Sequence, residues 1–329
     1  MISFCTLFDS NYLSRGLALY GSLQKHCRDF HIYFFAFDDS SYAILKKLDL
    51  EKATVVCLDD FEDEELLAVK PTRSHTEYCW TCTPSVIRYV LDKYNPQSCT
   101  YLDADLYFWS SPGILLGEIG SNSVIITEHR YTRCYDQSNK SGKYCVQFMT
   151  FKNDKSAKRV LEWWRNACNR WCYARYENGL FGDQKYLDDW PEKFEKVHTL
   201  EHLGGGIAPW NVQQYDIFKK NERLFGRAKN SGAEFKVIFF HFHHLRFYSS
   251  SRIDLGGYRL SDSVKELVYR PYIKHLKKIE TDIAGIGSFV NIHGETRLSF
   301  MNWGTLPRYV KHRLMSNILM HNERVPAGV

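Results

Sequence analysis

The sequence predicts an α/β fold in which helices flank a mostly parallel central sheet, with a helical appendage at the C-terminal end. Over the first hundred residues, short apolar runs alternate with segments of helical periodicity, which is typical of strands joined by helical crossovers. Turn and capping residues such as Asp9, Ser10 and Asn11 separate the two kinds of segment. An apolar run that ends in Asp103 and Asp105 is the third observation, because ligands bind at the carboxyl ends of parallel strands.

Taken in order, the elements follow from residue spacing. Residues 2–8 form a short apolar run and are expected to be the first strand. Residues 13–26 are expected to be a helix, because their apolar side chains recur at near-helical spacing. The helix before the two carboxylates is expected over residues 84–94, where the apolar residues share one face. The other expected strands are residues 32–37, 53–58, 100–102, 124–127 and 144–151, and the other expected helices end at Leu48 and span residues 157–176.

The character of the chain changes after Gly256. We expect a catalytic domain over residues 1–255 and a helical appendage over residues 256–329, with helices at about 261–283 and 307–322. The appendage carries basic residues among aromatic and aliphatic ones, so it could rest on an anionic membrane as a peripheral contact, or it could be a plain solvated face. These basic residues are Lys274, Lys277, Lys278, Arg308, Lys311 and Arg313.

Composition and charge exclude several classes of protein. The chain has 329 residues, of which 44% are hydrophobic and 25% charged, as is ordinary for a globular protein. A net charge of +5 is too small for a nucleic-acid-binding face, but it is compatible with a diphosphate substrate or an anionic membrane. No apolar stretch reaches the roughly 20 residues of a membrane span, and Met1 leads directly into a strand rather than a secretory signal. The expected location is therefore the cytoplasm, with peripheral contact at the inner face of the cell membrane as an option.

The ten cysteines do not form the framework of a small disulfide-rich domain. Cys79 and Cys82 have a spacing seen in metal and redox sites, and Cys168 and Cys172 are expected one helical turn apart. A four-cysteine zinc site would require the fold to join the two pairs, whereas separate buried thiols require nothing further. The sequence leaves both alternatives open.

The most informative motif is the pair Asp103 and Asp105 at the end of an apolar strand. Residues two apart in a strand point to the same side of it. Two carboxylates there suit Mg²⁺ or Mn²⁺, with diphosphate oxygens and water completing the coordination shell. Without a cation the two charges repel, so one carboxyl is expected to hold its proton. Short Asp-x-Asp strings also occur by chance in solvated loops, which is the alternative interpretation.

A second motif lies over residues 237–244, where an apolar run continues into His241, His243 and His244. A histidine in this position can supply a third metal ligand late in the chain. His241 and His243 would face the same way if the strand continued through both. The alternative for each is a histidine that is satisfied locally at the end of a strand.

Two glycine-containing loops complete the candidates. Residues 178–187 place Asp183 and Gln184 at a loop–helix junction, where a carboxylate and an amide can bind sugar hydroxyls. The alternative is that Asp183 is the N-cap of that helix. Residues 204–211 form a glycine-rich, flexible turn that ends in Trp210 and Asn211, which fits either a platform for a sugar or a turn closed by a core tryptophan.

Together and in this order, these segments resemble the nucleotide-diphospho-sugar glycosyltransferases of the A-type (GT-A) fold, a Rossmann-like nucleotide-sugar-binding fold. They are most similar to glycosyltransferase family eight and its bacterial relatives in surface polysaccharide synthesis, over roughly residues 1–250. The resemblance implies that residues 1–255 form a nucleotide-sugar-binding catalytic domain with a UDP-sugar as donor. It also implies a bound Mn²⁺ or Mg²⁺.

The same resemblance implies roles for individual residues. Asp103 and Asp105 match the metal motif of that family, and His241 matches its late histidine ligand. Asp183 and Gln184 would lie beside the transferred sugar as catalytic residues. The residues implied at the nucleotide are Phe8, Asp9, Tyr12, Arg88, Asp103, Ala104 and Asp105, and those implied at the substrates are His129, Gln147, Trp210, Asn211 and His243.

Two positions depart from the family pattern. Relatives usually carry Asn and Gly in the strand after the metal motif, where this chain has Cys145 and Gln147. The late histidine is usually followed by a small residue and a glycine, whereas His243 and His244 follow here. These bulkier groups would change contacts with the sugar and the acceptor.

The predicted function is transfer of a hexose or N-acetylhexosamine from a UDP-sugar to a glycan or lipid-linked acceptor. If the reaction inverts the anomeric centre, Asp183 is the expected base for the acceptor hydroxyl; if it retains, Asp183 orients the sugar. A catalytically degenerate sugar-nucleotide-binding protein is the non-enzymatic alternative. A haloacid-dehalogenase-type phosphatase also uses Asp-x-Asp after an apolar strand, but near the N-terminus and followed by Thr or Val rather than Leu106.

Overall fold

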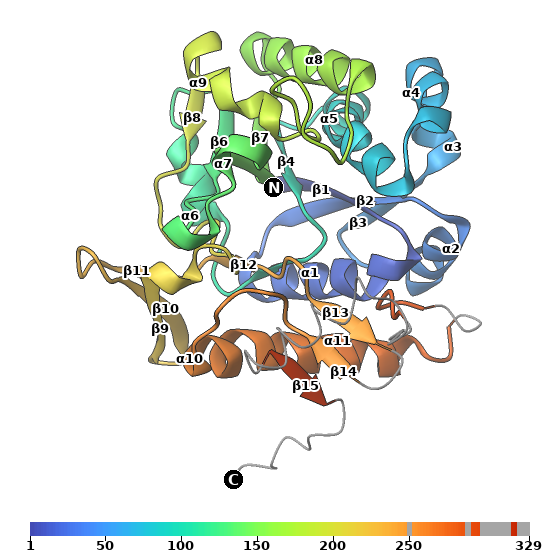
Figure 1. Ribbon diagram of the computed structural model, residues 1–329. Helices are drawn as coiled ribbons and strands as arrows, with labels where there is room; N and C mark the ends of the chain where they lie inside the picture. Colours follow the sequence, from blue (N-terminus) through green and yellow to red (C-terminus); the bar gives the residue numbers. More distant parts are fainter. Residues whose placement is uncertain (249–251, 287–290, 297–316, 321–329) are drawn as a thin grey trace.

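The computed structural model describes residues 1–248, 252–286, 291–296 and 317–320. Its centre is a seven-stranded sheet with the strand order β3-β2-β1-β4-β7-β6-β8 (Figure 1). Within this sheet only β7 runs against its described neighbours, so the expectation of a mostly parallel sheet is confirmed. The strands are β1 (Ile2–Phe8), β2 (Phe30–Ala36), β3 (Ala53–Cys57), β4 (Ser98–Leu102), β6 (Val124–Glu128), β7 (Tyr144–Lys152) and β8 (Val197–Thr199).

The direction of strand order reverses between β1 and β4. From β1 the chain moves outward through β2 to β3, and then returns to the other side of β1 as β4. Ligands of open α/β sheets bind outside the carboxyl ends of the strands at such a switch point. Asp9 directly follows β1 and Asp103 directly follows β4, so the topology places both residues at that edge.

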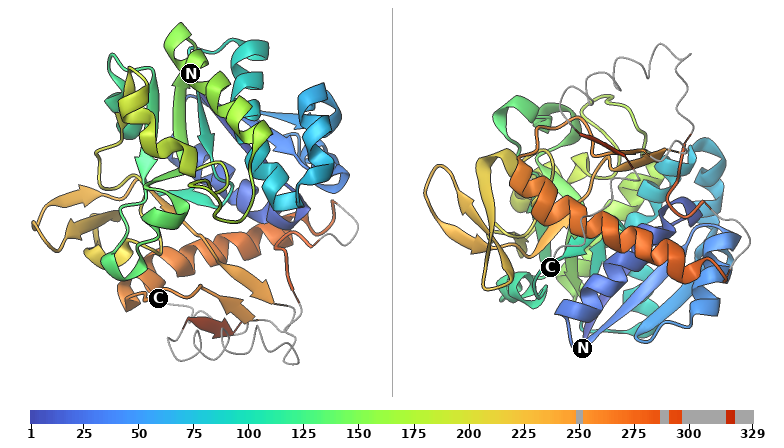
Figure 2. Two further views of the ribbon diagram at one scale, coloured as in Figure 1. Left: turned by 45° about the horizontal axis from the view of Figure 1, so that its top comes forward. Right: turned by 90° about the horizontal axis from the view of Figure 1, so that it is seen from below.

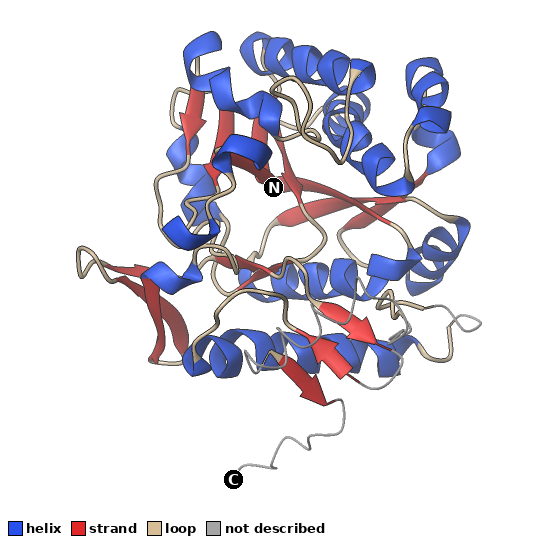
Figure 3. Ribbon diagram, viewed as in Figure 1, coloured by secondary structure: helices blue, strands red, loops and turns tan. Residues whose placement is uncertain are grey.

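Helices cover both faces of the sheet, as Figures 2 and 3 show. On one face α5 (His75–Tyr94) and α8 (Lys155–Arg170) pack against each other, and their buried residues share a core with β4 and β7. On the other face α1 (Leu13–His26) packs on the sheet, and α11 (Arg270–Ile283) packs against α1. The apolar side of each helix is thereby removed from water, which is the main stabilising contribution.

The helix before the two carboxylates begins earlier than its apolar spacing indicates. Ser74 caps α5, because its hydroxyl accepts from the backbone N–H of Glu77 while the Glu77 carboxylate accepts from the backbone N–H of Ser74. Pro84, the expected start, lies inside the helix. The added turns carry His75 to the edge of the sheet that holds the metal motif, where it contacts Asp9.

Smaller elements complete the chain. β5 (Leu106–Phe108) and β12 (Phe239–His241) form an antiparallel ribbon next to the metal motif. The remaining elements are α2 (Asp39–Leu48), α3 (Leu58–Phe61), α4 (Glu64–Val69), α6 (Gly113–Leu116), α7 (Ser138–Ser141), α9 (Trp190–Lys193), β9 (Tyr215–Lys220), β10 (Arg223–Ala228), β11 (Glu234–Lys236), β13 (Arg246–Tyr248), β14 (Arg252–Asp254), α10 (Asp262–Val264), β15 (Ile318–Met320), a π-helical segment at Lys265–Tyr269, and short 3-10 segments at Ser10–Tyr12, Lys70–Thr72, Gly117–Ile119, Arg133–Tyr135, Lys185–Asp189 and Val212–Gln214.

The C-terminal part is joined to the rest of the molecule. β14 pairs with β15, so a small sheet spans the expected boundary at residue 255. Tyr272 and Leu276 of α11 belong to the same core as α1 and β1. The second expected helix, residues 307–322, is wrong at 317–320, because 318–320 pair with β14 as a strand and Asn317 before them is not helical. Residues 307–316, 321 and 322 lie outside those described.

The apolar face of α11 points into this core. Its exposed side carries charges of both signs, and Lys278 pairs with Asp282 at 2.6 Å while Lys274 is exposed. Over α11 the burial of the apolar side chains favours the alternative of a solvated helical face, and the peripheral membrane contact stays a prediction. Arg308, Lys311 and Arg313 lie outside the described residues. Among the described residues, no helix combines the length and apolar character needed to cross a membrane.

Candidate active site

The candidate site lies at the carboxyl ends of β1 and β4, where β7 also contributes. Because β7 is antiparallel to β4, its first residues lie beside the end of β4. Leu102 pairs with Phe148, and the backbone N–H of Asp103 donates to the carbonyl of Gln147 at 3.0 Å. Side chains two apart in a strand share a face, so Cys145 and Gln147 approach the metal motif together.

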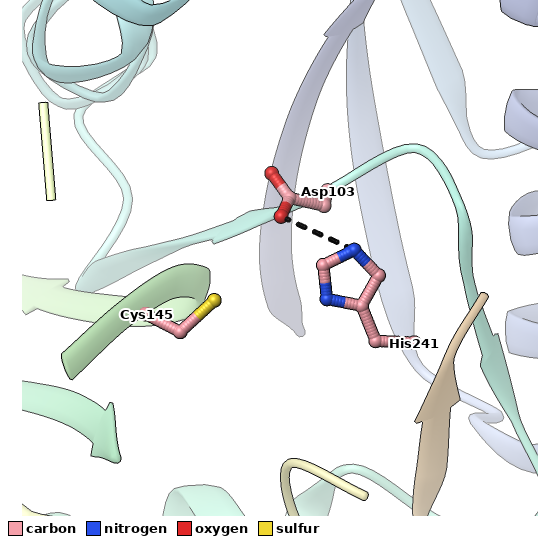
Figure 4. Close-up of side chains that lie close together, drawn as sticks. All are labelled: Asp103, Cys145 and His241. Carbon is pink, nitrogen blue, oxygen red and sulfur yellow. Dashed lines mark ion pairs between the residues drawn. The ribbon is translucent and has the colours of Figure 1, made fainter. Parts of the chain in front are cut away.

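His241 reaches the same point through the ribbon of β5 and β12. Leu106, directly after the metal motif, pairs with His241, and the backbone N–H of Phe242 donates to the carbonyl of Asp105 at 3.0 Å. The Nε2 atom of His241 lies 3.1 Å from Oδ1 of Asp105. It lies 3.8 Å from Oδ2 of Asp103, the pair that Figure 4 marks with a dashed line. The structure thus brings together the three residues that the sequence indicates as metal ligands.

Gln147 orients the His241 ring. Its Oε1 atom lies 2.8 Å from Nδ1 of His241, and both side chains are buried. An amide oxygen only accepts, so Nδ1 carries a proton and Nε2 faces the carboxylates. The Nε2 atom of Gln147 has no hydrogen-bond partner among the described residues, which leaves a buried donor for an oxygen of a bound ligand.

Replacing Gln147 with Leu is expected to weaken Mn²⁺ binding about 10- to 100-fold, because the Nδ1–H group of His241 loses the acceptor that orients the ring. Isothermal titration calorimetry with Mn²⁺ measures the change in affinity. Thr150→Val is the matched control, since Thr150 is buried on the same strand and its hydroxyl bonds that of Thr100. Equal affinity in wild type and Gln147→Leu would show that this amide does not position the ring.

Buried charge in the site is strongly perturbed. Burial raises the pKa of Asp103 to about 6, and repulsion from Asp105 adds to this while His241 opposes it. Burial also acts to raise the pKa of Asp105, but His241 and His243 outweigh it and hold the pKa at about 2. Burial disfavours the His241 imidazolium, yet the two carboxylates raise its pKa well above the usual value. A proton on His241 therefore supplies positive charge that a bound cation would replace.

The donor set fits a divalent cation. Carboxylate oxygens and an imidazole nitrogen converge from two distant segments at the switch point, and these are ligands of Mn²⁺ and related metals. Among the described residues, one group of three ligand atoms lies within 4.8 Å of one another: those of Asp103, Cys145 and His241. Asp105 is outside that group but contacts His241 directly. The crowded acidic groups need compensating positive charge, which a cation supplies.

Asp183 lies close to the metal motif. Its side chain caps no helix, because the 3-10 segment Lys185–Asp189 follows Gln184 and has no side-chain cap, so the N-cap alternative is wrong. The residue is only 5% exposed. Burial and the charge of Asp103 raise the pKa of Asp183 to about 8, although a hydrogen bond from Thr83 acts to lower it. A buried carboxyl with such a pKa fits an acid–base or sugar-orienting role.

Asp9 and Tyr12 lie at the β1 side of the switch point. The Oδ2 atom of Asp9 lies 3.0 Å from Nε2 of His75 and accepts from the side chain of Asn11 at 3.0 Å. Tyr12 is 43% exposed, and the guanidinium of Arg15 lies 4.5 Å from its ring centroid. An exposed ring backed by a cation is suited to stacking on a flat heterocycle.

Arg15 has a structural role that the sequence does not signal. Its guanidinium is buried and donates to the carbonyls of Asn11, Leu245 and His293, so it ties α1 to the C-terminal segment. Its positive charge also helps to lower the pKa of Asp105. In the sequence Arg15 is one basic residue of an amphipathic helix, with no spacing that distinguishes it from a solvated arginine.

The side chains of three residues implied at the nucleotide lie in the core or on the outer side of a helix pair, so no side-chain contact with the nucleotide is supported for them. Phe8 is 3% exposed and its ring packs edge-on against Phe34 at 5.6 Å, so its side chain is part of the core. The methyl group of Ala104 is likewise in the core. Arg88 forms an ion pair with Glu162 of α8 at 3.0 Å on the exposed side of the α5–α8 pair, so the fold does not bring it to the site.

His129, Trp210 and Asn211 build a buried wall beside His241. Trp210 Nε1 and Asn211 Nδ2 both donate to the carbonyl of His129 at 2.8 Å, and the Trp210 ring centroid lies 5.2 Å from that of His241. Burial lowers the pKa of His129 to about 3, so its ring is neutral. The remaining hydrogen bonds of Asn211 go to the backbone of its own turn, so Asn211 locks the turn rather than binding a substrate, which corrects that expectation.

Close packing, rather than flexibility, explains the glycine run at residues 204–206. All three glycines are buried, and a Cβ atom on Gly204 would lie 1.8 Å from the carbonyl oxygen of Lys236. Gly206 has a φ of +91°, which L side chains rarely adopt. The tight turn seats Trp210 against His241.

Two further predicted residues reach the rim of the site. The strand ends at His241, so His243 lies in the following turn, with its ring 5.7 Å from that of His241 and stacked on His244 at 3.8 Å. Burial lowers the pKa of His243 well below the usual value. Gln184 donates from Nε2 to the carbonyl of Ser141 at 2.7 Å, which leaves its Oε1 for a hydroxyl group.

A cavity of about 580 Å³ lies next to the buried wall. Tyr131 lines it and stacks on the His129 ring at 4.5 Å. Its volume is typical of ligand sites, and most of the residues that line it are polar or charged. The lining residues are Glu128, Arg130, Tyr131, Asp136, Ser138, Lys143, Leu203, Gln214, Tyr215, Ala228, Asn230 and Ser231.

The two cysteine pairs do not form a zinc site. All ten cysteines are described, and all are free. In the part of the chain that the structure describes, no group of metal-ligating side chains contains Cys79, Cys82, Cys168 or Cys172. The structure therefore supports the alternative of separate thiols.

Comparison with known proteins identifies two similar Bacillus subtilis (strain 168) proteins. The chain is 31% identical over 281 residues to the uncharacterized protein YfnD, covering 84% of this chain and 88% of YfnD. It is 30% identical over 260 residues to the uncharacterized protein YfnF, covering 76% of this chain and 84% of YfnF. No protein-family model matches the chain.

Solved structures show the same architecture. The galactosyltransferase LgtC in complex with donor and acceptor sugar analogs has a TM-score of 0.55 at 10% identity, covering 87% of this chain and 100% of LgtC. The structure of an LgtC active-site mutant has a TM-score of 0.51 at 9% identity, with the same coverage. At these identities the likeness shows the fold, and it confirms the expected GT-A architecture.

Proposed function

This chain belongs to the family of the Bacillus subtilis proteins YfnD and YfnF, and from that premise we propose that it is a metal-dependent glycosyltransferase. It would move a hexose or N-acetylhexosamine from a UDP-sugar to a glycan or lipid-linked acceptor, in the cytoplasm, during surface polysaccharide synthesis. The LgtC structure with donor and acceptor sugar analogs has the same fold, but a fold alone does not determine chemistry. The proposal therefore depends on the residues of the site.

One observation carries the proposal. Asp103, Asp105 and His241, from distant parts of the chain, converge at the switch point of the sheet, with Asp183 close to Asp103. Burying several carboxylates together costs free energy, so a buried acidic cluster of this kind indicates a functional site. A nucleotide diphosphate bound through a divalent cation accounts for the acidic site, for its place at the strand ends and for the neighbouring exposed Tyr12.

Asp103, Asp105 and His241 would hold Mn²⁺ or Mg²⁺. When bound there, the cation neutralises the diphosphate and stabilises the leaving group. Gln147 keeps Nε2 of His241 directed at the carboxylates, and its buried amide N–H donors, which have no partner among the described residues, would donate to a ligand oxygen. The buried wall that includes Trp210 excludes water from one side of these groups.

Asp183 would act on the sugar or the acceptor. With a pKa of about 8 and no cation, its carboxyl holds a proton at neutral pH and can donate a hydrogen bond to a hydroxyl oxygen. A cation beside Asp103 would favour the ionised form of Asp183. In an inverting reaction the ionised carboxylate takes the proton of the acceptor hydroxyl; in a retaining reaction it orients the sugar. Gln184 would bind a neighbouring hydroxyl through Oε1.

The donor and acceptor would enter from different sides. Asp9 and Tyr12 would bind the base and ribose of the nucleotide at the end of β1. We infer that the acceptor binds in the cavity beside Tyr131, because its polar lining offers hydrogen bonds of both kinds and one aromatic surface. The stacked rings of Tyr131 and His129 connect this cavity to the wall beside His241.

The alternatives make different demands on the site. A sugar-nucleotide-binding protein without activity would bind donor and cation but would not cleave the donor. A haloacid-dehalogenase-type phosphatase would need its Asp-x-Asp early in the chain, whereas Asp103 follows the fourth strand and the fold is that of LgtC.

The proposal is tested by a screen of UDP- and GDP-sugars with and without Mn²⁺, on wild type and Asp105→Ala. We expect one donor to raise the melting temperature and to be hydrolysed only when Mn²⁺ is present, and both effects to be lost in Asp105→Ala. Thermal shift and release of the nucleotide are the two measurements. Stabilisation without hydrolysis, even with glycan acceptors added, would favour the non-enzymatic alternative, and no response to any donor would contradict the UDP-sugar proposal.

A further inference from the structure

Cys145 lies among the proposed metal ligands. Its Sγ atom, a carboxylate oxygen of Asp103 and a ring nitrogen of His241 lie within 4.8 Å of one another (Figure 4). Two ligands of one ion are at most about two bond lengths apart, or about 4.6 Å for metal–sulfur bonds. A small inward movement of these side chains would therefore let all three touch a single cation.

The position of the thiol follows from the sheet. Cys145 lies near the start of β7, which is antiparallel to β4, so it is beside the end of β4 where Asp103 follows. Gln147, two residues later, bonds His241, and Cys145 lies on the same side of the strand. The residue is 4% exposed, and Ala208 and Trp210 cover it.

We infer that Cys145 is a sulfur ligand of the catalytic cation and that it determines which cation the site accepts. The inference rests on the proposed metal-dependent function and adds the identity of the cation to it. Thiolate sulfur is a soft ligand that favours Zn²⁺ and other transition metals, whereas Mg²⁺ requires oxygen ligands in near-octahedral geometry. A site of one carboxylate, one imidazole and one thiolate, with Asp105 as an adjacent carboxylate, selects a transition metal over Mg²⁺.

The other cysteines provide the contrast. In the described residues, which include all ten cysteines, Cys145 alone belongs to a group of three potential metal ligands. Cys27 is buried to a similar degree, at 5% exposure, but it follows α1 and precedes the start of β2, so it lies at the amino-terminal ends of the strands, away from the metal motif. A buried thiol with only a packing role would resemble Cys27 and would have no carboxylate and imidazole beside it.

Cobalt titration tests the inference without relying on activity. Co²⁺ bound to a thiolate gives a charge-transfer band in the near ultraviolet, so adding Co²⁺ to the metal-free protein is expected to produce this band in wild type and in Cys27→Ser. Cys145→Ser is expected to lose the band while still binding Co²⁺ by calorimetry. The ratio of Zn²⁺ affinity to Mg²⁺ affinity is expected to be at least about tenfold lower in Cys145→Ser than in wild type. Because the two ratios are compared, the generally tighter binding of Zn²⁺ to protein ligands cancels.

The outcomes separate this inference from the proposed function. If wild type binds Co²⁺ without the band, or if Cys145→Ser keeps both the band and the Zn²⁺ preference, sulfur ligation is wrong while metal dependence stands. Cys79→Ser is a second control, because Cys79 and His75 could bind Co²⁺ and contribute to the band: Sγ of Cys79 lies 3.9 Å from Nε2 of His75, and the pair is partly exposed. If none of Co²⁺, Mn²⁺, Zn²⁺ and Mg²⁺ binds, with or without UDP, both the inference and the metal-dependent function are overturned.

Discussion

Replacing Asp183 with Asn is expected to stabilise the metal-free protein at alkaline pH while lowering the rate of sugar transfer at least about 100-fold. Burial and the charge of Asp103 raise the pKa of Asp183 to about 8, so the folded state disfavours the ionised carboxylate. Asn has a similar shape and no charge. The substitution therefore removes an unfavourable buried charge together with the group proposed to act on the substrates.

The stabilisation has a defined pH dependence. In the unfolded chain an Asp carboxyl loses its proton at about pH 4, whereas Asp183 in the folded protein holds its proton up to about pH 8. Between these values the folded state binds more protons, so the free energy of unfolding falls as pH rises. The gain from Asp183→Asn is near zero below about pH 4 and reaches the order of a few kcal/mol above about pH 8.

Thermal denaturation in the presence of EDTA, over about pH 5 to pH 9, measures this difference. Asp154→Ala is the control, because the Asp154 carboxylate caps α8 by accepting from the backbone N–H of Ala157 at 2.9 Å. Burial opposes the charge of Asp154, but these hydrogen bonds lower its pKa, so its contribution to stability is lost as pH falls. Removing that cap is expected to destabilise the protein by about 1 kcal/mol at neutral pH. A melting-temperature difference between Asp183→Asn and wild type that does not grow with pH would contradict a buried, protonated Asp183.

Asp103→Asn is expected to weaken Mn²⁺ binding and to lower kcat/KM about 10³-fold or more, because it removes the carboxylate that forms one group of potential metal ligands with His241 and Cys145. In the metal-free protein the same substitution is expected to be stabilising above about pH 6. The folded-state pKa of Asp103, about 6, is above the ordinary value of an Asp carboxyl. As pH rises, the carboxyl therefore loses its proton in the unfolded chain before it does so in the folded protein, and the free energy of unfolding of the wild type falls. Calorimetry with Mn²⁺ and assays of nucleotide release measure the two losses.

Asp92→Asn is the matched control for Asp103→Asn. Asp92 is exposed on α5, where it pairs with Arg88 and Lys158, so its removal leaves cation binding and transfer unchanged. Transfer by Asp103→Asn at the wild-type rate, with the same dependence on Mn²⁺, would contradict the assignment of the metal site.

The two substitutions are coupled. The charge of Asp103 raises the pKa of Asp183, so Asp103→Asn lowers that pKa and reduces the penalty that Asp183→Asn relieves. The double variant is therefore expected to gain less stability than the sum of the single variants. Groups arranged for catalysis commonly reduce stability in this way.

Elements of this protein that depend on short-range interactions could be predicted from the sequence alone. The first strand and the first helix match residues 2–8 and 13–26 as expected, because apolar spacing and turn residues act within a few positions of the chain. The metal motif at the end of β4 is visible for the same reason. The predicted start of α5 at Pro84 is wrong, because the capping box of Ser74 and Glu77, which is also a local sequence pattern, starts the helix at His75.

The meeting of side chains across the site depends on the tertiary structure. Cys145 and Gln147 read as departures from a family pattern, and only the antiparallel direction of β7 places them beside Asp103 and His241. The same applies to Arg88, whose helix was expected but whose side chain pairs with Glu162 away from the site.

What the sequence by itself determined about this protein was the α/β class, most of its strands and helices, and the residue types available for a metal and a sugar. Only the tertiary structure decided that Phe8 and Asn211 serve packing and a turn, that residues 318–320 form a strand, and that Cys145 adjoins the metal ligands. The physical reason is that spacing and capping are interactions within one element. Strand order, strand direction and register are set by the packing of the whole core, which one segment of sequence does not contain.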